Sequence, residues 1–180
     1  MIAECAEAIG RKPVLLGRSM EKYGLTAERM KFVSLPKTTS VFGNRRVIDR
    51  MMRRMMKEGK EQFLPIVTGH QGEPGALLTR LAHGDTPYQL SKGDKVLFSA
   101  NVIPNPLNHA NRAEIELLLE RAGARIFTDL HVSGHAYRED HYEFMHLLQP
   151  QHIIPAHGDL SMASKYVQFS GELGYTLNDT

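Results

Sequence analysis

Short apolar runs bounded by turn residues recur along the whole chain. They cover residues 13–17, 63–68, 95–100, 125–130 and 152–154. Continuous apolar runs of this kind are typical of buried strands. The pattern therefore predicts a sheet whose strands are spread over the full length of the chain, with residues 174–180 as the start of a further strand.

Segments with helical spacing of apolar residues lie between these runs. The clearest is residues 45–59, where four apolar residues share one face and Gly59 marks the end: Ile48, Met51, Met52 and Met55. The other predicted helices span residues 3–10, 20–31, 76–82, 111–122, 139–148 and 161–169. Strand–helix units with short connections favour a parallel sheet flanked by helices, so the predicted fold class is α/β.

Composition narrows the class of protein only slightly. The 180 residues are 42% hydrophobic and 23% charged, with a net charge of +2, which gives no global attraction to nucleic acid. Cys5 is the only cysteine, which excludes an internal disulfide and a multi-cysteine zinc site and suits the cytoplasm. No apolar run approaches the ~18 residues of a membrane span, so no membrane association is expected.

Two loops after predicted strands carry candidate anion-binding groups. Residues 68–75 have the spacing Gly-x-x-Gly-x-x-Gly between a strand and a helix. Such a loop brings backbone N–H groups close to a phosphate, or it is a plain turn in which Pro74 opens the helix. Residues 99–106 offer Ser99, Asn101 and Asn105 to phosphate or sugar oxygens, with a surface turn as the alternative.

Three histidines follow the last two predicted strands. His131 and His135 lie on a loop with Ser133 and Gly134, a setting that suits gripping and protonating a phosphoryl group. His157 follows a Pro-marked turn, and neutral imidazole is the commonest zinc ligand. Taken in isolation, each of these is more often a structural histidine than a ligand. Because ligands bind beyond the strand ends of an open α/β sheet, we expect these loops and the two glycine- and asparagine-bearing loops to share one crevice.

One predicted helix has a basic side opposite its methionines, formed by Arg45, Arg46, Arg50, Arg53, Arg54 and Lys57. A solvated face and an RNA-phosphate contact both fit this pattern.

Taken in order, residues 17–20, 68–75, 99–106, 131–136 and 154–159 resemble the ribonuclease J family, its archaeal form in particular, in the β-CASP branch of the metallo-β-lactamase superfamily. The resemblance implies a β-CASP domain over residues 1–122. Residues 123–180 are then a partial C-terminal return toward the metallo-β-lactamase domain, and both ends of the chain are truncated.

The resemblance also implies an activity and a set of site residues. The family is a two-zinc hydrolase that degrades RNA from a 5′-monophosphate end. His157 matches a zinc ligand, and His135 matches the catalytic histidine that assists at the scissile phosphate. The residues matched to RNA-phosphate binding are His131, Val132, Ser133, Gly134, His135, Gly69, His70, Gln71, Gly72, Glu73, Ser99, Asn101 and Arg18.

Some features depart from the family. Asp159 replaces the glutamate of its His-Gly-Glu motif and keeps a carboxylate, and residues 104–106 differ from the bacterial Pro-Gly-Asn. The metal-binding His-x-His-x-Asp-His cluster is absent. The leading interpretation is therefore a fragment of a zinc-dependent 5′–3′ exoribonuclease, inactive alone, whose partners are RNA and the missing N-terminal metallo-β-lactamase half. The alternatives are a non-catalytic module that binds RNA or nucleotide phosphate, and a dimerisation element whose Met- and Arg-bearing helix contributes to a homodimer.

Overall fold

The computed structural model describes residues 2–128, 130 and 134–178, which divide into two compact units. Unit 1 is residues 1–132 and unit 2 is residues 133–180. This division falls further along the chain than the domain boundary predicted between residues 122 and 123, and that boundary stays a prediction. No helix among the described residues is long and apolar enough to cross a membrane.

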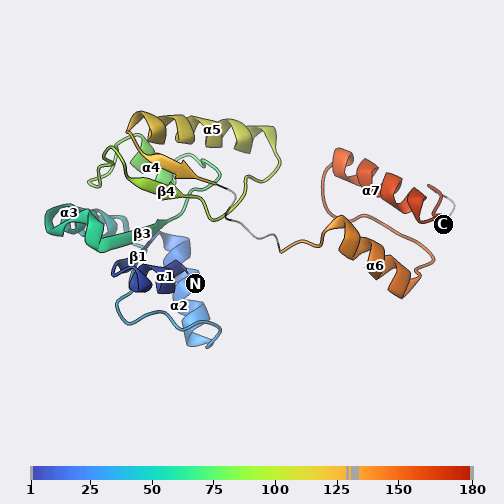
Figure 1. The fold of residues 1–180 in the computed structure, drawn as a ribbon, viewed down its shortest axis with the longest axis horizontal. Coiled ribbons are helices and arrows are strands. Elements are labelled where there is room, and N and C mark those ends of the chain that lie inside the picture. The colour runs from blue at the N-terminus through green and yellow to red at the C-terminus, as the bar shows by residue number, and fades with distance from the viewer. Residues whose placement is uncertain (1, 129, 131–133, 179–180) are drawn as a thin grey trace. The chain divides into compact units, whose positions relative to one another are not determined.

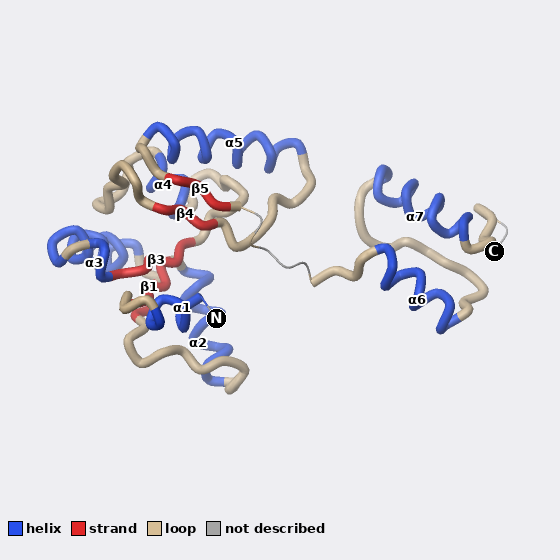
Figure 2. Tube along the Cα trace, in the orientation of Figure 1, coloured by secondary structure: helices blue, strands red, loops and turns tan. Residues whose placement is uncertain are grey.

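The described residues of unit 1 form five strands in two sheets, and the neighbouring strands of each sheet pair in parallel (Figures 1 and 2). The three-stranded sheet has the order β2 (Ser40–Phe42), β1 (Lys12–Leu16), β3 (Phe63–Val67). The two-stranded sheet joins β4 (Lys95–Leu97) to β5 (Arg125–Phe127). The predicted α/β architecture of parallel strands flanked by helices is confirmed, and its strands form two sheets rather than one.

Helices connect these strands. They are α1 (Ile2–Ala8), α2 (Arg18–Arg29), α3 (Arg45–Glu58), the short 3₁₀ helix η1 (Lys60–Gln62), α4 (Leu77–Ala82) and α5 (Pro106–Arg121). Helix α3 begins where the Asn44 side chain accepts a hydrogen bond from the Arg46 amide at 3.0 Å. Helix α5 begins five residues before the predicted start at 111, because Asn105 caps it and Pro106 fits its first turn.

The core of unit 1 lies between the helices and the sheets. Met52 and Met55 of α3 are fully buried against Val14 and Leu16 of β1, as the apolar stripe predicts. Leucines of α4 and two residues of α5, Ile115 and Leu119, belong to the same cluster. The same cluster thus holds α3 together with α4 and α5, the two helices that follow the loops of residues 68–76 and 99–105.

Unit 2 contains two helices and no strand among its described residues (Figure 2). Helices α6 (Arg138–Leu148) and α7 (Leu160–Glu172) are joined by an ion pair between Arg138 and Glu172. The rings of His141 and Tyr166 pack edge to face, with their centres 5.4 Å apart. Burial raises the pKa of the Tyr166 phenol. The Tyr175 hydroxyl donates to the Pro150 carbonyl at 2.7 Å, which fastens the connecting segment to the end of α7.

The predictions of strands at residues 152–154 and 174–180 are wrong over the described residues. Ile154 is 84% exposed, and residues 174–178 have no strand conformation. An apolar run becomes a strand only where another strand satisfies its N–H and C=O groups, and the described residues of unit 2 supply no such partner. The short strand β2 was not predicted, because its three half-buried residues are too few for a periodic signal.

Candidate phosphate-binding and metal-ligating site

The carboxyl ends of β1 and β3 meet at one edge of the three-stranded sheet. Leu16 is paired with Val67, so the residues that follow, Gly17 and Thr68, are neighbours. A Cβ on Gly17 would lie 3.0 Å from the Thr68 hydroxyl, and its φ of 141° favours glycine. The close approach brings the start of α2, with the exposed side chain of Arg18, to the edge from which the loop of residues 68–76 emerges.

The loop of residues 68–76 is held by its own hydrogen bonds. The Gly72 amide donates to the Gly69 carbonyl at 3.1 Å, and the Gln71 amide donates to the Glu73 carboxylate at 3.2 Å. The Leu78 amide donates to the Thr68 carbonyl at 3.0 Å. Two of the N–H groups predicted to face an anion are therefore already engaged within the loop.

Gln71 joins this loop to the second predicted loop. Its side chain is 5% exposed; Nε2 donates to the Asn101 carbonyl at 3.1 Å, and Oε1 accepts from the Ile103 amide at 3.0 Å. Both ends of the amide are thus satisfied by the backbone of residues 101–103. The two strand-end loops of unit 1 that the sequence predicts to act together are in contact, and Gln71 is the bridge between them.

Arg112 holds the same loop from helix α5. Its side chain is buried, and Nη1 donates to the His70 carbonyl at 2.8 Å. Nε bonds the Glu116 carboxylate at 2.7 Å, and the guanidinium lies 3.2 Å from the centre of the Phe98 ring. One buried cation therefore contacts the glycine loop, the end of β4 and its own helix.

Arg112 was missed by the sequence prediction, although a signal exists. Arg112 shares the apolar stripe of α5 with Ile115 and Leu119, and a charged residue at a core position of a helix is informative because an unpaired buried charge is costly. Of the remaining predicted residues of unit 1, Gly69 and Gly72 are buried within the loop. His70 is half-buried, while Glu73, Ser99 and Asn101 are exposed.

In unit 2 the structure brings two predicted residues together. The rings of His135 and His157 are 6.1 Å apart in an edge-to-face arrangement, and both side chains are exposed, as is Gly134. Asp159 accepts a hydrogen bond from the Met162 amide at 2.9 Å and so caps α7. The predicted residues His131, Val132 and Ser133 lie outside the described residues.

The described residues offer individual candidate metal ligands rather than a complete site. Among the described residues, no three His, Cys, Asp or Glu side chains converge as a metal site requires. The described residues therefore do not fit a zinc site by themselves, and His157 is at most one ligand of such a site. Since the glycine loop belongs to unit 1 and the His135–His157 pair to unit 2, their predicted convergence on one crevice stays a prediction.

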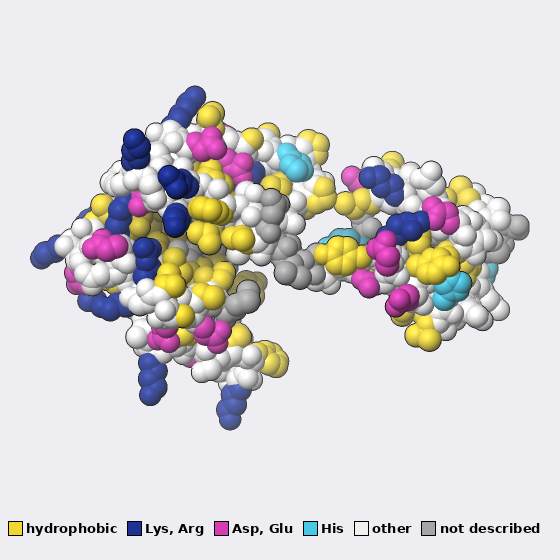
Figure 3. All heavy atoms as spheres, viewed as in Figure 1, with side chains coloured by type: hydrophobic (Ala, Val, Ile, Leu, Met, Phe, Trp, Pro, Cys, Tyr) yellow, Lys and Arg dark blue, Asp and Glu magenta, His cyan; other side chains and the backbone are white. Residues whose placement is uncertain are grey.

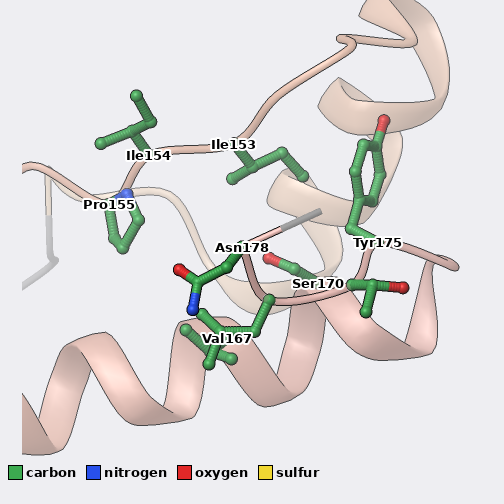
Figure 4. A pocket seen from close by; sticks show the side chains of 9 residues that line it. Ile153, Ile154, Pro155, Val167, Ser170, Tyr175 and Asn178 are labelled. Atoms are coloured by element: carbon green, nitrogen blue, oxygen red, sulfur yellow. The ribbon is translucent and has the colours of Figure 1, made fainter. Parts of the chain in front are cut away.

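A shallow pocket of about 210 Å³ lies beside the segment that leads to His157 (Figure 4). Ile153, Pro155, Val167 and Tyr175 line it. Its volume is below the roughly 300–1,000 Å³ of small-molecule sites. We therefore assign no ligand to it.

Comparison with known proteins divides the chain into two adjoining matches. Residues 1–118 match the family described as "Ribonuclease J, beta-CASP domain", and residues 121–175 match "Zn-dependent metallo-hydrolase RNA specificity domain". Ribonuclease J of Methanocaldococcus jannaschii is 46% identical over 178 residues, which cover 99% of this chain and 40% of that protein. Ribonuclease J of Pyrococcus abyssi is 40% identical, over 98% of this chain and 38% of that protein. The chain thus spans about two fifths of the length of these relatives.

Proposed function

Because this chain belongs to the ribonuclease J β-CASP family, we propose that it supplies the RNA-holding part of a zinc-dependent 5′–3′ exoribonuclease that acts on 5′-monophosphate RNA. The observation that carries the proposal is the meeting of His135 and His157, whose rings are 6.1 Å apart although 21 residues separate them in the chain. Two exposed imidazoles at this distance can serve one phosphate and one metal ion at the same time.

In this proposal the two histidines have different tasks. His157 provides one neutral imidazole to a zinc ion, whose bound form supplies an activated water, and the other ligands come from outside these 180 residues. His135 is the catalytic residue that donates or accepts a proton at the scissile phosphate. His131, Val132, Ser133 and Gly134 complete its phosphate-binding loop.

The loops of unit 1 hold the 5′ end of the RNA. His70 and Glu73 form the surface offered to the terminal nucleotide, together with Ser99, Asn101 and Arg18, while the buried Gly69 and Gly72 give the loop its shape. Gln71 acts as a positioning residue, since both ends of its amide are bonded to backbone groups of the neighbouring loop. An arginine and a hydroxyl at the rim can bind phosphate oxygens, with the guanidinium supplying the positive charge.

The experiment fuses this chain to the remaining sequence of the Methanocaldococcus jannaschii relative and measures zinc content and single-turnover hydrolysis of 5′-monophosphate RNA. His157→Ala should lower both, because the ion loses an imidazole ligand. His135→Ala should keep the metal and reduce turnover by roughly 10²–10⁴. His146→Ala, an exposed histidine of α6, is the matched control and should change neither.

A second function, binding of RNA or nucleotide phosphate without hydrolysis, is favoured by the lack of any three-ligand cluster among the described residues. The fusion separates the two. Adenosine monophosphate that binds tightly to a fusion without chelator-sensitive hydrolysis would support the binding module and refute the nuclease.

A further inference from the structure

Helix α3 carries a straight row of cations. Arg46, Arg50, Arg53 and Lys57 follow one another at spacings of four, three and four residues, which places them on one face of a helix. All four are exposed. We call this row the cationic stripe.

The stripe lies opposite the face by which α3 is anchored. Ile48, Met51, Met52 and Met55 are at most 7% exposed in the core of unit 1. The orientation of the helix is therefore determined by burial, and the stripe must face solvent. Figure 3 shows Lys and Arg side chains bordering the α3 end of this unit.

Charge is concentrated here to an unusual degree. Helix α3 has six cationic and two acidic side chains, although the whole chain has a net charge of only +2. Within the part of the chain that the structure describes, none of the four stripe residues forms an ion pair. By contrast, Arg54 pairs with Glu58, and Lys60 pairs with Asp94.

The stripe starts at the sheet edge that carries the candidate phosphate loop. Phe42 of β2 is paired with Leu16, and the Gly17 amide donates to the Phe42 carbonyl at 2.9 Å. Only Gly43, Asn44 and Arg45 separate Phe42 from Arg46. The stripe then runs away from this edge for about 16 Å, at about 1.5 Å per residue.

The charge, exposure and position of the cationic stripe indicate which kind of molecule binds it. We propose that the cationic stripe binds the phosphate backbone of single-stranded RNA beyond the nucleotide held by the loops; this inference rests on the proposed function. At about 3.4 Å per nucleotide along a helical strand, about 16 Å corresponds to four or five phosphates, close to the number of cations. A membrane surface fits poorly, because such a helix needs an exposed apolar face and the apolar face of α3 is buried.

The test measures fluorescence anisotropy of a 20-nucleotide 5′-monophosphorylated oligoadenylate with the 180-residue chain between 50 and 200 mM KCl. The variant R46Q/R50Q/R53Q/K57Q should weaken binding at least tenfold at 50 mM salt. It should also flatten the slope of log K against log salt by about 2 to 3, since each neutralised phosphate of a single strand contributes about 0.7. R46K/R50K/R53K should retain affinity within about threefold, because an ammonium still neutralises a phosphate.

The matched control removes four other exposed cations, K22Q/R29Q/R121Q/R125Q, and makes the same change in net charge. It should bind the oligonucleotide with a nearly unchanged slope. Equal losses in both variants, or no loss in the stripe variant, would overturn the proposal, as would an acidic protein segment that binds the stripe while RNA does not.

Adenosine monophosphate separates this inference from the function on which it rests. The stripe variant should bind the mononucleotide as the unchanged chain does. If the unchanged chain binds neither mononucleotide nor oligonucleotide, the proposed function fails and the inference fails with it. If the unchanged chain binds both ligands and the stripe variant binds the oligonucleotide equally well, the inference alone is wrong.

Discussion

Replacing Arg112 with methionine should release the glycine loop from helix α5. The guanidinium donates to the His70 carbonyl at 2.8 Å and lies over the Phe98 ring at 3.2 Å. Methionine is shorter but unbranched and adaptable in shape, so it fills part of the same space without providing a donor. The variant therefore tests mainly the polar contacts of Arg112, with a smaller loss of volume than an alanine would cause.

The expected loss of unfolding free energy is about 2–4 kcal/mol. A hydrogen bond from a charged donor contributes about 1.5–3 kcal/mol, and a desolvated cation–π contact contributes up to about 2 kcal/mol, with partial overlap between the two. Glu116 adds little, because its side chain is 34% exposed and water can solvate the carboxylate after its partner is removed. The loss of unfolding free energy in Arg112→Lys should be smaller than in Arg112→Met, because lysine keeps the positive charge although it lacks the planar guanidinium.

Hydrogen exchange read by mass spectrometry in a urea series is the suitable assay, because peptides report units 1 and 2 separately where a single unfolding curve would mix them. Peptides over residues 69–75 and 99–103 should lose protection in Arg112→Met, while α7 of unit 2 should not change. Glu116→Gln is the matched control and should lower the unfolding free energy by less than about 1 kcal/mol. A change below about 0.5 kcal/mol in Arg112→Met, or a Glu116→Gln variant equally destabilised, would refute this account of the loop.

Two further predictions concern the same unit. Gly72→Ala should destabilise unit 1 by roughly 2–4 kcal/mol, because Gly72 has a φ of 81° and a Cβ would lie 2.6 Å from the Asn111 backbone. Gly75 has a φ of 75° with open space around it, so Gly75→Ala should cost only about 1–2 kcal/mol of unfolding free energy in the same urea series. Equal losses in the two variants would contradict the role of the Asn111 contact. Burial, followed by the nearby Asp94 charge, raises the pKa of Tyr88, so stability present below the ordinary tyrosine pKa of about 10 should decline as pH rises through the folded pKa. Tyr88→Phe should remove that decline in unfolding measured from pH 9 to 11, and a variant that declines as steeply as the unchanged chain would show that another group is responsible.

Helices were easier to predict than strands, for a physical reason. A helix satisfies its backbone hydrogen bonds within one segment, so the Met stripe and Gly59 suffice to predict α3 almost to the residue. A strand depends on a neighbour elsewhere in the chain. Residues 152–154 have the composition of a strand and no partner among the described residues, whereas β2 has a partner in β1 and almost no composition signal.

The sequence predicted the loops of the candidate site but not the side-chain contacts that hold these loops in place. Glycines and small polar residues mark the loops of residues 68–76 and 99–106, because only a few residue types tolerate such backbone conformations. Which side chain joins them depends on packing across 30 residues, from Gln71 to Asn101, and across 42, from His70 to Arg112. Periodicity within a single segment does not encode contacts of this range.

The exposure of unit 2 bears directly on the role of His157. Leu147, Ile154 and Leu160 are 82%, 84% and 87% exposed, which is unusual for large aliphatic side chains so close together in sequence. The segment that carries His157 therefore receives little support from the described residues around it, and its imidazole has one aromatic neighbour, His135. A metal ligand needs a fixed orientation, which neighbouring groups normally impose. If His157 ligates zinc, the groups that orient it must cover this apolar surface as well, so metal binding and protection of Ile154 and Leu160 from solvent should appear together in the fusion protein.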